Sequence, residues 1–299
     1  MSIFTGAGIA LITPMDKYGA IDYDSMEQII TNQIAEGTDA IIVCGTTGEA
    51  STMSHDEHIE TIRTCVSIVH QRVPVIAGTG SNCTKTAIHL SKEAYKAGAD
   101  GLLVVTPYYN KGTQKGMQKH FETIARAVDL PMLLYNIPGR TGVNLKPETI
   151  ATLVKEVPGI VGVKEASGDL SQVATLLSLT DGDIDVYSGN DDQIVPVVAL
   201  GGKGVISVLS HVAPKDTHDM VMSLLKGDID TSQRLQRKYI PLIHALFSEV
   251  NPIPVKAAMN MMGYAVGTPR LPLTEMEPAH KVLLRKAMEE SGISVTREY

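Results

Sequence analysis

The chain has 299 residues, and its 43% hydrophobic content supports a single large core with a smaller attached part. Asp and Glu outnumber Lys and Arg by 33 to 26, and the net charge of −7 argues against a nucleic-acid-binding groove. No apolar run reaches the roughly 20 residues that cross a bilayer, and the N-terminus lacks a signal-peptide pattern. We therefore expect a cytoplasmic protein without a membrane or nucleic-acid partner.

Short apolar segments alternate with amphipathic segments over most of the chain. The predicted strands are Gly8–Ile12, Ala40–Val43, Val73–Gly78, Gly101–Val105, Pro131–Tyr135, Ile160–Lys164, Ile184–Gly189 and Gly204–Val208. Helices are predicted at 23–36, 54–70, 84–97, 113–128 and 147–156. Eight units at the spacing of a βα repeat indicate the α/β class, and they favour a closed (β/α)8 TIM barrel over an open doubly wound sheet.

The strand pattern stops after Lys226, and the remaining chain has only helical patterns. These helices are predicted at 228–248, 254–262 and 277–291. We predict a barrel catalytic domain over residues 1–226 and a C-terminal helical domain over residues 227–299. Because this all-helical appendage is small, we expect it to pack on the barrel or on a neighbouring subunit.

The predicted sixth strand ends in Lys164, which is unusual because burying an unpaired ammonium group costs several kcal/mol. One interpretation is that Lys164 forms an ion pair with a carboxylate such as Glu165. The other is that the apolar setting favours the neutral amine, which can attack a carbonyl group. The strand considered alone favours the ion pair.

The active site of such a barrel lies at the carboxyl ends of its strands. The candidate residues there are Thr46, Thr47, Tyr109, Tyr135, Arg140, Lys164, Gly189 and Ile206. An amine can form an imine with an α-keto acid, phenols and hydroxyls can move protons, and a guanidinium can bind a carboxylate. Each residue alone has an ordinary structural explanation, but their gathering on one face indicates carbonyl chemistry.

Five ordered motifs cover nearly the whole chain, and a sixth extends into the tail. They are Gly45-Thr46-Thr47-Gly48-Glu49, Thr106-Pro107-Tyr108-Tyr109-Asn110, Tyr135-Asn136-Ile137-Pro138-Gly139-Arg140-Thr141-Gly142, Val163-Lys164-Glu165-Ala166, Gly204-Val205-Ile206-Ser207 and Asn251-Pro252-Ile253-Pro254-Val255-Lys256. With these motifs the chain resembles the dihydrodipicolinate synthase family, within the pyruvate-dependent class I aldolases. The resemblance implies a Schiff-base-forming lyase that condenses pyruvate with L-aspartate 4-semialdehyde, in the diaminopimelate route of lysine biosynthesis.

The resemblance also implies the catalytic residues. Lys164 would form the imine with pyruvate, and Tyr135, Thr46 and Tyr109 would form a proton relay. Tyr109 would reach across a subunit interface, because the family is typically a homotetramer built as a dimer of dimers. No cofactor is implied beyond the covalent imine on Lys164, and no metal.

The substrate-binding residues implied by the resemblance are four. Thr47 would hold the pyruvate carboxylate, and Gly189 and Ile206 would line that site through their backbones. Arg140 would bind the carboxylate of the semialdehyde, a feature that separates this activity from that of a pyruvate aldolase acting on a sugar acid. A non-catalytic barrel that senses a keto acid is the alternative from another class, and it would need neither the lysine nor the relay.

The sequence departs from the family pattern at two places. Lys111 precedes Gly112 where the family often has proline, which we expect to loosen the Tyr108-Tyr109 loop. Lysine inhibits many members near positions that match His55, His58, Asn82 and Tyr108. Thr86 stands where sensitive members carry an acidic side chain, so the resemblance predicts weak inhibition by lysine.

Other chemistry-bearing residues have simpler interpretations. His55-Asp56-Glu57-His58 has metal-ligand types, but it is predicted on the first turn of a helix with no third ligand in view. The three cysteines form no CxxC, and Cys44 is predicted to be a buried strand thiol. The acidic pair Asp191-Asp192 is predicted as a solvated loop or a helix cap.

Overall fold

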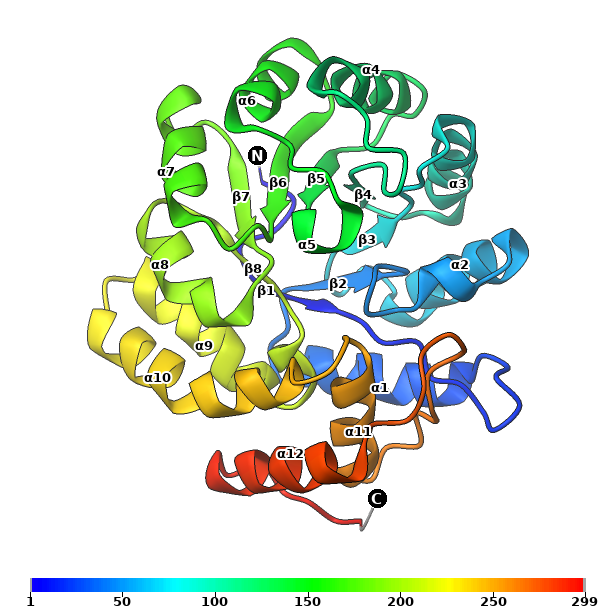
Figure 1. Cartoon of the computed structure of the whole chain (residues 1–299), viewed down its shortest axis with the longest axis vertical. Coiled ribbons are helices and arrows are strands. Elements are labelled where there is room, and N and C mark those ends of the chain that lie inside the picture. Colours follow the sequence, from blue (N-terminus) through cyan, green and yellow to red (C-terminus); the bar gives the residue numbers. More distant parts are fainter. Residues whose placement is uncertain (1, 298–299) are drawn as a thin grey trace.

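The computed structural model describes residues 2–297. Its eight strands form one closed parallel barrel in chain order, in which β8 returns to pair with β1. The strands are β1 (Gly6–Ala10), β2 (Ala40–Val43), β3 (Val75–Gly78), β4 (Gly101–Val105), β5 (Met132–Asn136), β6 (Ile160–Glu165), β7 (Asp185–Ser188) and β8 (Gly204–Ser207). Figure 1 shows helices on the outside of this ring, which confirms the predicted (β/α)8 barrel.

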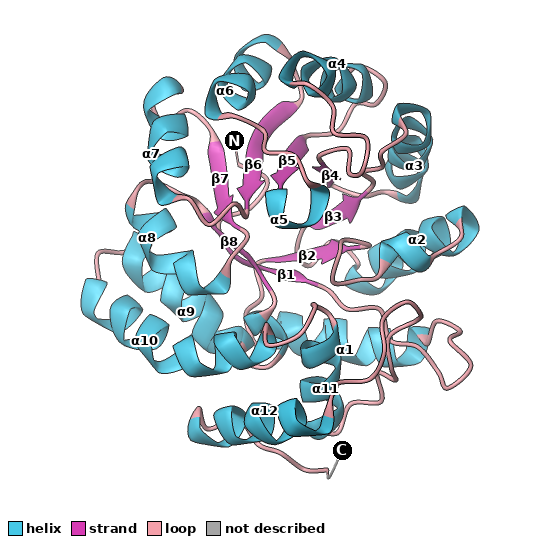
Figure 2. Cartoon of the chain, viewed as in Figure 1, coloured by secondary structure: helices cyan, strands magenta, loops and turns pink. Residues whose placement is uncertain are grey.

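The connecting segments carry the outer helices, which stand out from the central strands in Figure 2. These are α1 (Tyr23–Ala35), α2 (His55–Val69), α3 (Thr84–Ala97), α4 (Gln114–Ala125), α5 (Pro138–Thr141), α6 (Pro147–Glu156), α7 (Leu170–Leu179), α8 (Ile194–Ala199) and α9 (Pro214–Leu225). Ser54 and Glu57 make the predicted capping box at the start of α2. The short α5 was not predicted; Pro138 begins it and Gly142, at a φ of 72°, ends it.

The first strand begins two residues earlier than predicted because it pairs with β8 at two glycines. Gly6 lies opposite Gly204. A Cβ atom on Gly204 would lie 1.8 Å from the carbonyl oxygen of Gly6, and its φ is +157°. Only glycine allows this approach, and it closes the barrel.

The strands are buried on both faces, as expected for a parallel sheet between two packed layers. Alternate residues point into the barrel, and Leu133, Tyr135, Tyr187 and Ile206 belong to this inner cluster. The other face packs against the helices in a larger core. The inner layer is where a polar residue from one strand can meet residues from several others.

The tail contains α10 (Ile229–Leu246), α11 (Ile253–Met261) and α12 (Pro278–Glu290), close to the predicted bounds. In Figure 1 α10 runs beside α9, and α12 lies beside α11. Lys256 of α11 forms a buried ion pair with Glu49, which follows β2. The tail therefore contacts the barrel directly. No helix within residues 2–297 has the length and apolarity to cross a membrane.

Candidate active site

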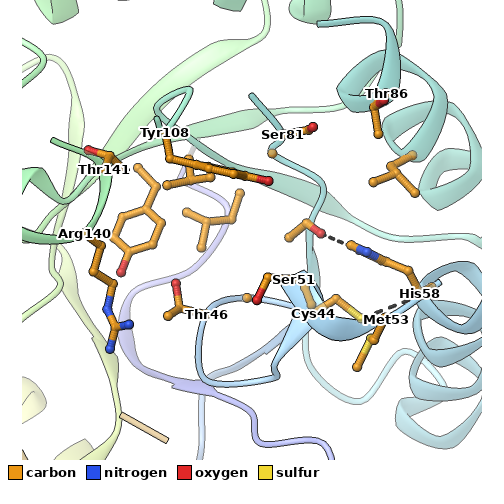
Figure 3. Close-up of a pocket in the computed structure, with 18 of the residues that line it drawn as sticks. Cys44, Thr46, Ser51, Met53, His58, Ser81, Thr86, Tyr108, Arg140 and Thr141 are labelled. Carbon is orange, nitrogen blue, oxygen red and sulfur yellow. Dashed lines mark hydrogen bonds between the residues drawn. The ribbon is translucent and has the colours of Figure 1, made fainter. Parts of the chain in front are cut away.

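A cavity of about 350 Å³ opens at the carboxyl ends of β2 to β5. Its wall is formed by the segments that follow these strands, and it includes Thr46, Tyr108, Tyr135 and Arg140. Figure 3 shows Arg140 and Thr46 toward one end, and His58 and Thr86 toward the other. The cavity thus brings three of the predicted site residues, Thr46, Tyr135 and Arg140, to one place.

Lys164 lies in the barrel interior, next to this cavity. It is in register with Tyr135 on one neighbouring strand and with Tyr187 on the other. Its Nζ atom lies 4.5 Å from the centre of the Tyr135 ring, and the residue is 6% exposed. The amine and the phenol ring of Tyr135 are therefore in contact at the carboxyl ends of β5 and β6.

The ion pair between Lys164 and Glu165 does not form. Glu165 faces the other side of β6, as neighbours on a strand must. Its carboxylate accepts hydrogen bonds from Ser167 N at 2.7 Å, Gln172 Nε2 at 3.0 Å and Asn136 Nδ2 at 3.1 Å. Within residues 2–297 no carboxylate forms a salt bridge with Lys164. The interpretation of Lys164 as a structural ion pair is therefore wrong.

Gly189 and Ile206 lie close to Lys164. A Cβ atom on Gly189 would lie 3.1 Å from Lys164 Cε and 2.6 Å from Ala166 Cβ. Any larger residue would displace the lysine stem, so glycine is required here by the packing. Ile206 is 1% exposed and belongs to the inner cluster that also contains Tyr135. Gly189 therefore leaves the space that the Cε end of the lysine side chain occupies.

Thr47 and Arg140 meet through a residue of the tail. Asn251 Nδ2 donates a hydrogen bond to Thr47 Oγ1 at 2.9 Å. Arg140 Nη2 donates to the carbonyl oxygen of the same Asn251, also at 2.9 Å. Thr47 is 3% exposed in this arrangement. The two groups predicted to bind substrate carboxylates are therefore held by one asparagine.

Tyr109 does not reach the cavity in the single chain. It is 88% exposed, with a φ of 71°, and its backbone N donates to Thr141 O at 3.4 Å. Its neighbour Tyr108 lines the cavity instead. An exposed tyrosine beside the site agrees with a role across an interface, which stays a prediction.

Two further side chains of the cavity, His58 and Cys44, are buried and hydrogen-bonded to backbone carbonyl groups. His58 is buried, which lowers its pKa, and its Nε2 donates to Gly78 O at 2.7 Å. Burial raises the pKa of the Cys44 thiol, which donates to His58 O. The hydrogen bond to Gly78 O occupies Nε2 of His58, and a protonated thiol is a poor nucleophile. Within residues 2–297 no group of three or more metal-ligating side chains comes together.

Asp191 corrects one interpretation of the sequence. It is 2% exposed and is not part of a solvated acidic loop. Its Oδ2 accepts hydrogen bonds from Val208 N at 3.0 Å and Leu209 N at 2.9 Å, at the end of β8. Burial raises its pKa. Its role is to fasten the β7 exit to the β8 exit.

Sequence analysis missed the residues that support the site from a distance. Asn251, Glu49 and Lys256 are all at most 6% exposed. Glu49 directly follows the Thr46-Thr47-Gly48 turn in a left-handed conformation, with a φ of 57°. The motif from Asn251 to Lys256 was visible in the sequence, but no local spacing relates it to a turn 200 residues earlier.

The fold and the site together are those of a (β/α)8 barrel with a buried lysine at the carboxyl ends of its strands. The lysine forms no salt bridge among residues 2–297 and contacts a tyrosine at the carboxyl end of the barrel, beside a cavity lined in part by Thr46 and Arg140. Residues 3–291 match the family model described as the dihydrodipicolinate synthetase family, and the chain belongs to this family.

Similar proteins cover nearly the full length. A 4-hydroxy-tetrahydrodipicolinate synthase of Lachnoclostridium phytofermentans is 57% identical over 98% of this chain and 100% of its own length. One from Caldicellulosiruptor bescii is 54% identical over 99% of both chains. A crystal structure of the dihydrodipicolinate synthase from Acinetobacter baumannii, complexed with pyruvate, has a TM-score of 0.95 and 43% identity and covers 97% of this chain and 99% of that one.

Proposed function

We propose that the protein is a 4-hydroxy-tetrahydrodipicolinate synthase, which condenses pyruvate with L-aspartate 4-semialdehyde. The observation that carries this proposal is the buried Lys164, which lacks an acidic partner and packs against Tyr135. Membership of the family and full-length relatives of this activity support it. The reaction belongs to the diaminopimelate route of lysine biosynthesis.

The first half of the proposed reaction takes place on Lys164. Its neutral amine attacks the keto carbon of pyruvate, and loss of one water gives an imine. The protonated imine withdraws electrons from the neighbouring methyl group, which loses a proton and becomes an enamine carbon. Each step moves a proton. Tyr135 contacts Lys164 Nζ and can donate or accept protons during these steps. Thr46, in the same cavity, and Tyr109 of a neighbouring subunit extend this relay.

In the second half of the proposed reaction, the enamine on Lys164 reacts with the acceptor, aspartate semialdehyde. The enamine carbon attacks the aldehyde carbon of the semialdehyde and forms the new carbon–carbon bond. The amino group of the acceptor then attacks the imine carbon, and the bond to Lys164 Nζ breaks as the ring closes. Arg140 binds the acceptor carboxylate at the cavity, and Thr47 holds that of pyruvate with the Gly189 and Ile206 backbones.

The chemistry needs no cofactor beyond the imine, because the lysine itself supplies the electron sink. We further propose a cytoplasmic homotetramer made of two dimers, in which Tyr109 completes the relay of a partner. Its 88% exposure in the single chain supports this assignment. One structural relative is described as a monomeric variant, so the assembly requires its own measurement.

Steady-state turnover tests the proposed function. We expect pyruvate consumption only when aspartate semialdehyde is present, and no cleavage of N-acetylneuraminate. Arg140→Ala should raise the KM for the semialdehyde by about a hundredfold, because it removes a charge-assisted bond to a carboxylate. The exposed Arg126→Ala is the matched control and should leave this KM unchanged. Turnover of a sugar acid, or equal effects of both variants, would contradict the assignment.

A further inference from the structure

One asparagine of the C-terminal segment touches both predicted carboxylate-binding groups. Asn251 lies just before α11 and is 6% exposed. Its side-chain Nδ2 donates to Thr47 Oγ1, and its backbone carbonyl accepts from Arg140 Nη2. No other residue described in the structure bonds to both. The asparagine therefore connects the two halves of the substrate site.

The direction of the bond to Thr47 has a chemical consequence. A hydroxyl group has one proton to donate and two lone pairs that accept. Because Asn251 Nδ2 donates to Thr47, it occupies a lone pair and leaves the proton free. Across residues 2–297, no acceptor takes that proton. Thr47 is therefore set as a hydrogen-bond donor, which is what a carboxylate ligand requires.

The opposite orientation would abolish this property. If the asparagine oxygen faced Thr47, the hydroxyl would donate to Asn251 and could not donate to a ligand. Asn251 Oδ1 is buried without a partner among residues 2–297. The amide thus leaves its own acceptor unbonded while it turns its amino group to Thr47.

We propose that Asn251 is a positioning residue, which makes Thr47 a donor to the pyruvate carboxylate and holds Arg140 for the acceptor. This inference rests on the proposed function. The C-terminal segment is accordingly part of the substrate site as well as a cover for the barrel.

A second connection supports the proposal by holding the same two segments together. Lys256 of α11 pairs with Glu49 at 2.5 Å, and Glu49 follows the Thr46-Thr47 turn by two residues. Arg270 N also donates to Glu49 Oε2 at 2.8 Å. The turn is thus bonded to the tail at two points, one of them a buried ion pair, close in sequence to Thr47.

The test is an isosteric change of bond direction. In Asn251→Asp a carboxylate replaces the amide, accepts the Thr47 proton and places a negative charge beside the ligand. We expect the KM for pyruvate to rise by about a hundredfold at pH 8, the combined effect of one lost bond and one repulsive charge. The increase should shrink toward pH 5, where a protonated carboxyl group can donate again. Asn251→Ala, which only removes the donor, should raise this KM by about tenfold.

The matched control is Asn260→Asp. Asn260 is 7% exposed on α11, the helix that follows Asn251, and its side chain bonds to Gly267 O and Val266 N. It should lose stability and leave the KM for pyruvate unchanged. Equal KM changes in the Asn251 and Asn260 variants, or no pH dependence in Asn251→Asp, would overturn the inference.

Two readouts separate this inference from the proposed function. If borohydride traps no pyruvate on Lys164 of the wild-type protein, the proposed function fails. If the wild-type protein is trapped normally and the Asn251 variants keep its KM for pyruvate, only the inference fails. If Asn251→Asp does not fold, the smaller change in Asn251→Ala decides, with an unchanged KM as the contradicting result.

Discussion

Two lysines are buried among residues 2–297, Lys256 in the tail and Lys164 in the barrel, and their surroundings differ. Lys256 is 1% exposed and lies 2.5 Å from the carboxylate of Glu49. Lys164 is 6% exposed, with a tyrosine ring at 4.5 Å and no salt bridge to any carboxylate among residues 2–297. A buried ammonium group needs a partner, and only the first lysine has one.

The difference separates a structural lysine from a chemical one. Glu49 compensates the charge of Lys256, so this pair fastens the tail to the turn after β2. Lys164 has no such compensation, and its Nζ atom lies against the ring of Tyr135 beside the cavity. Burial is common to both lysines, and the counter-ion is the feature that differs between them.

The largest expected effect comes from removing the chemical lysine. Lys164→Met should lower turnover at least a thousandfold, because no other group can form the imine. Its free energy of unfolding should stay equal or rise, since an apolar side chain replaces an uncompensated amine. Turnover and urea unfolding measure the two effects. Substantial residual turnover, or a destabilised fold, would contradict the distinction between the lysines.

Removing the structural lysine, Lys256, should instead lower the stability of the fold. Lys256→Met leaves the Glu49 carboxylate buried without a counter-ion, and should lower the free energy of unfolding by about 3–5 kcal/mol. The double variant Lys256→Met/Glu49→Gln removes both charges and should recover most of this loss. Urea unfolding of the single and double variants measures it. An unaffected single variant would show that the pair does not fasten the tail.

The two tyrosines beside Lys164 sharpen the comparison. Tyr135 lines the cavity, whereas the hydroxyl of Tyr187 donates to Phe4 O at 2.6 Å. Tyr135→Phe should lower kcat by about a hundredfold, the usual range for a lost proton-transfer group, while the pyruvate imine still forms. Tyr187→Phe should keep kcat and lose about 1 kcal/mol of stability with its hydrogen bond. Equal loss of kcat in both would remove Tyr135 from the relay.

The smallest expected effect on stability comes from the partly exposed ion pair between Arg270 of the tail and Glu57 of α2. The hydrogen bond from Arg270 at 2.5 Å is the main cause that lowers the pKa of Glu57 from 4.5 to about 2. Since the native pKa is lower than the unfolded one, this stabilisation is complete above about pH 4.5 and is lost as pH falls toward 2. Water screens the half-exposed pair, so Glu57→Gln should cost about 1 kcal/mol at pH 7.

Urea unfolding at pH 7 and pH 3 tests that linkage. The difference in free energy of unfolding between wild type and Glu57→Gln should shrink at pH 3. At that pH Glu57 is largely protonated in the unfolded chain, so the ion pair contributes less to stability. Lys215–Asp219, an exposed pair on α9, offers a control, because Asp219→Asn should change stability little at either pH. A difference between wild type and Glu57→Gln that does not depend on pH would contradict the assignment.

The sequence predicted the barrel because each buried strand is a local apolar run. It also located Lys164 and Tyr135, since strand ends in a parallel barrel meet on one face. It could not choose between an ion pair and a nucleophile for Lys164, because a carboxylate from another strand or loop could have paired with it. Only the three-dimensional structure shows which side chains surround the amine. The support from Asn251 and Lys256 was missed for a related reason: these contacts join residues about 200 positions apart.

The most direct test of the central claim is to treat the protein with pyruvate and borohydride and map the modified peptide. The account predicts one pyruvyl adduct per chain, on Lys164, which persists in Lys256→Met and disappears in Lys164→Met. An adduct on Lys256, or none at all, would show that the lysine without a counter-ion is not the nucleophile.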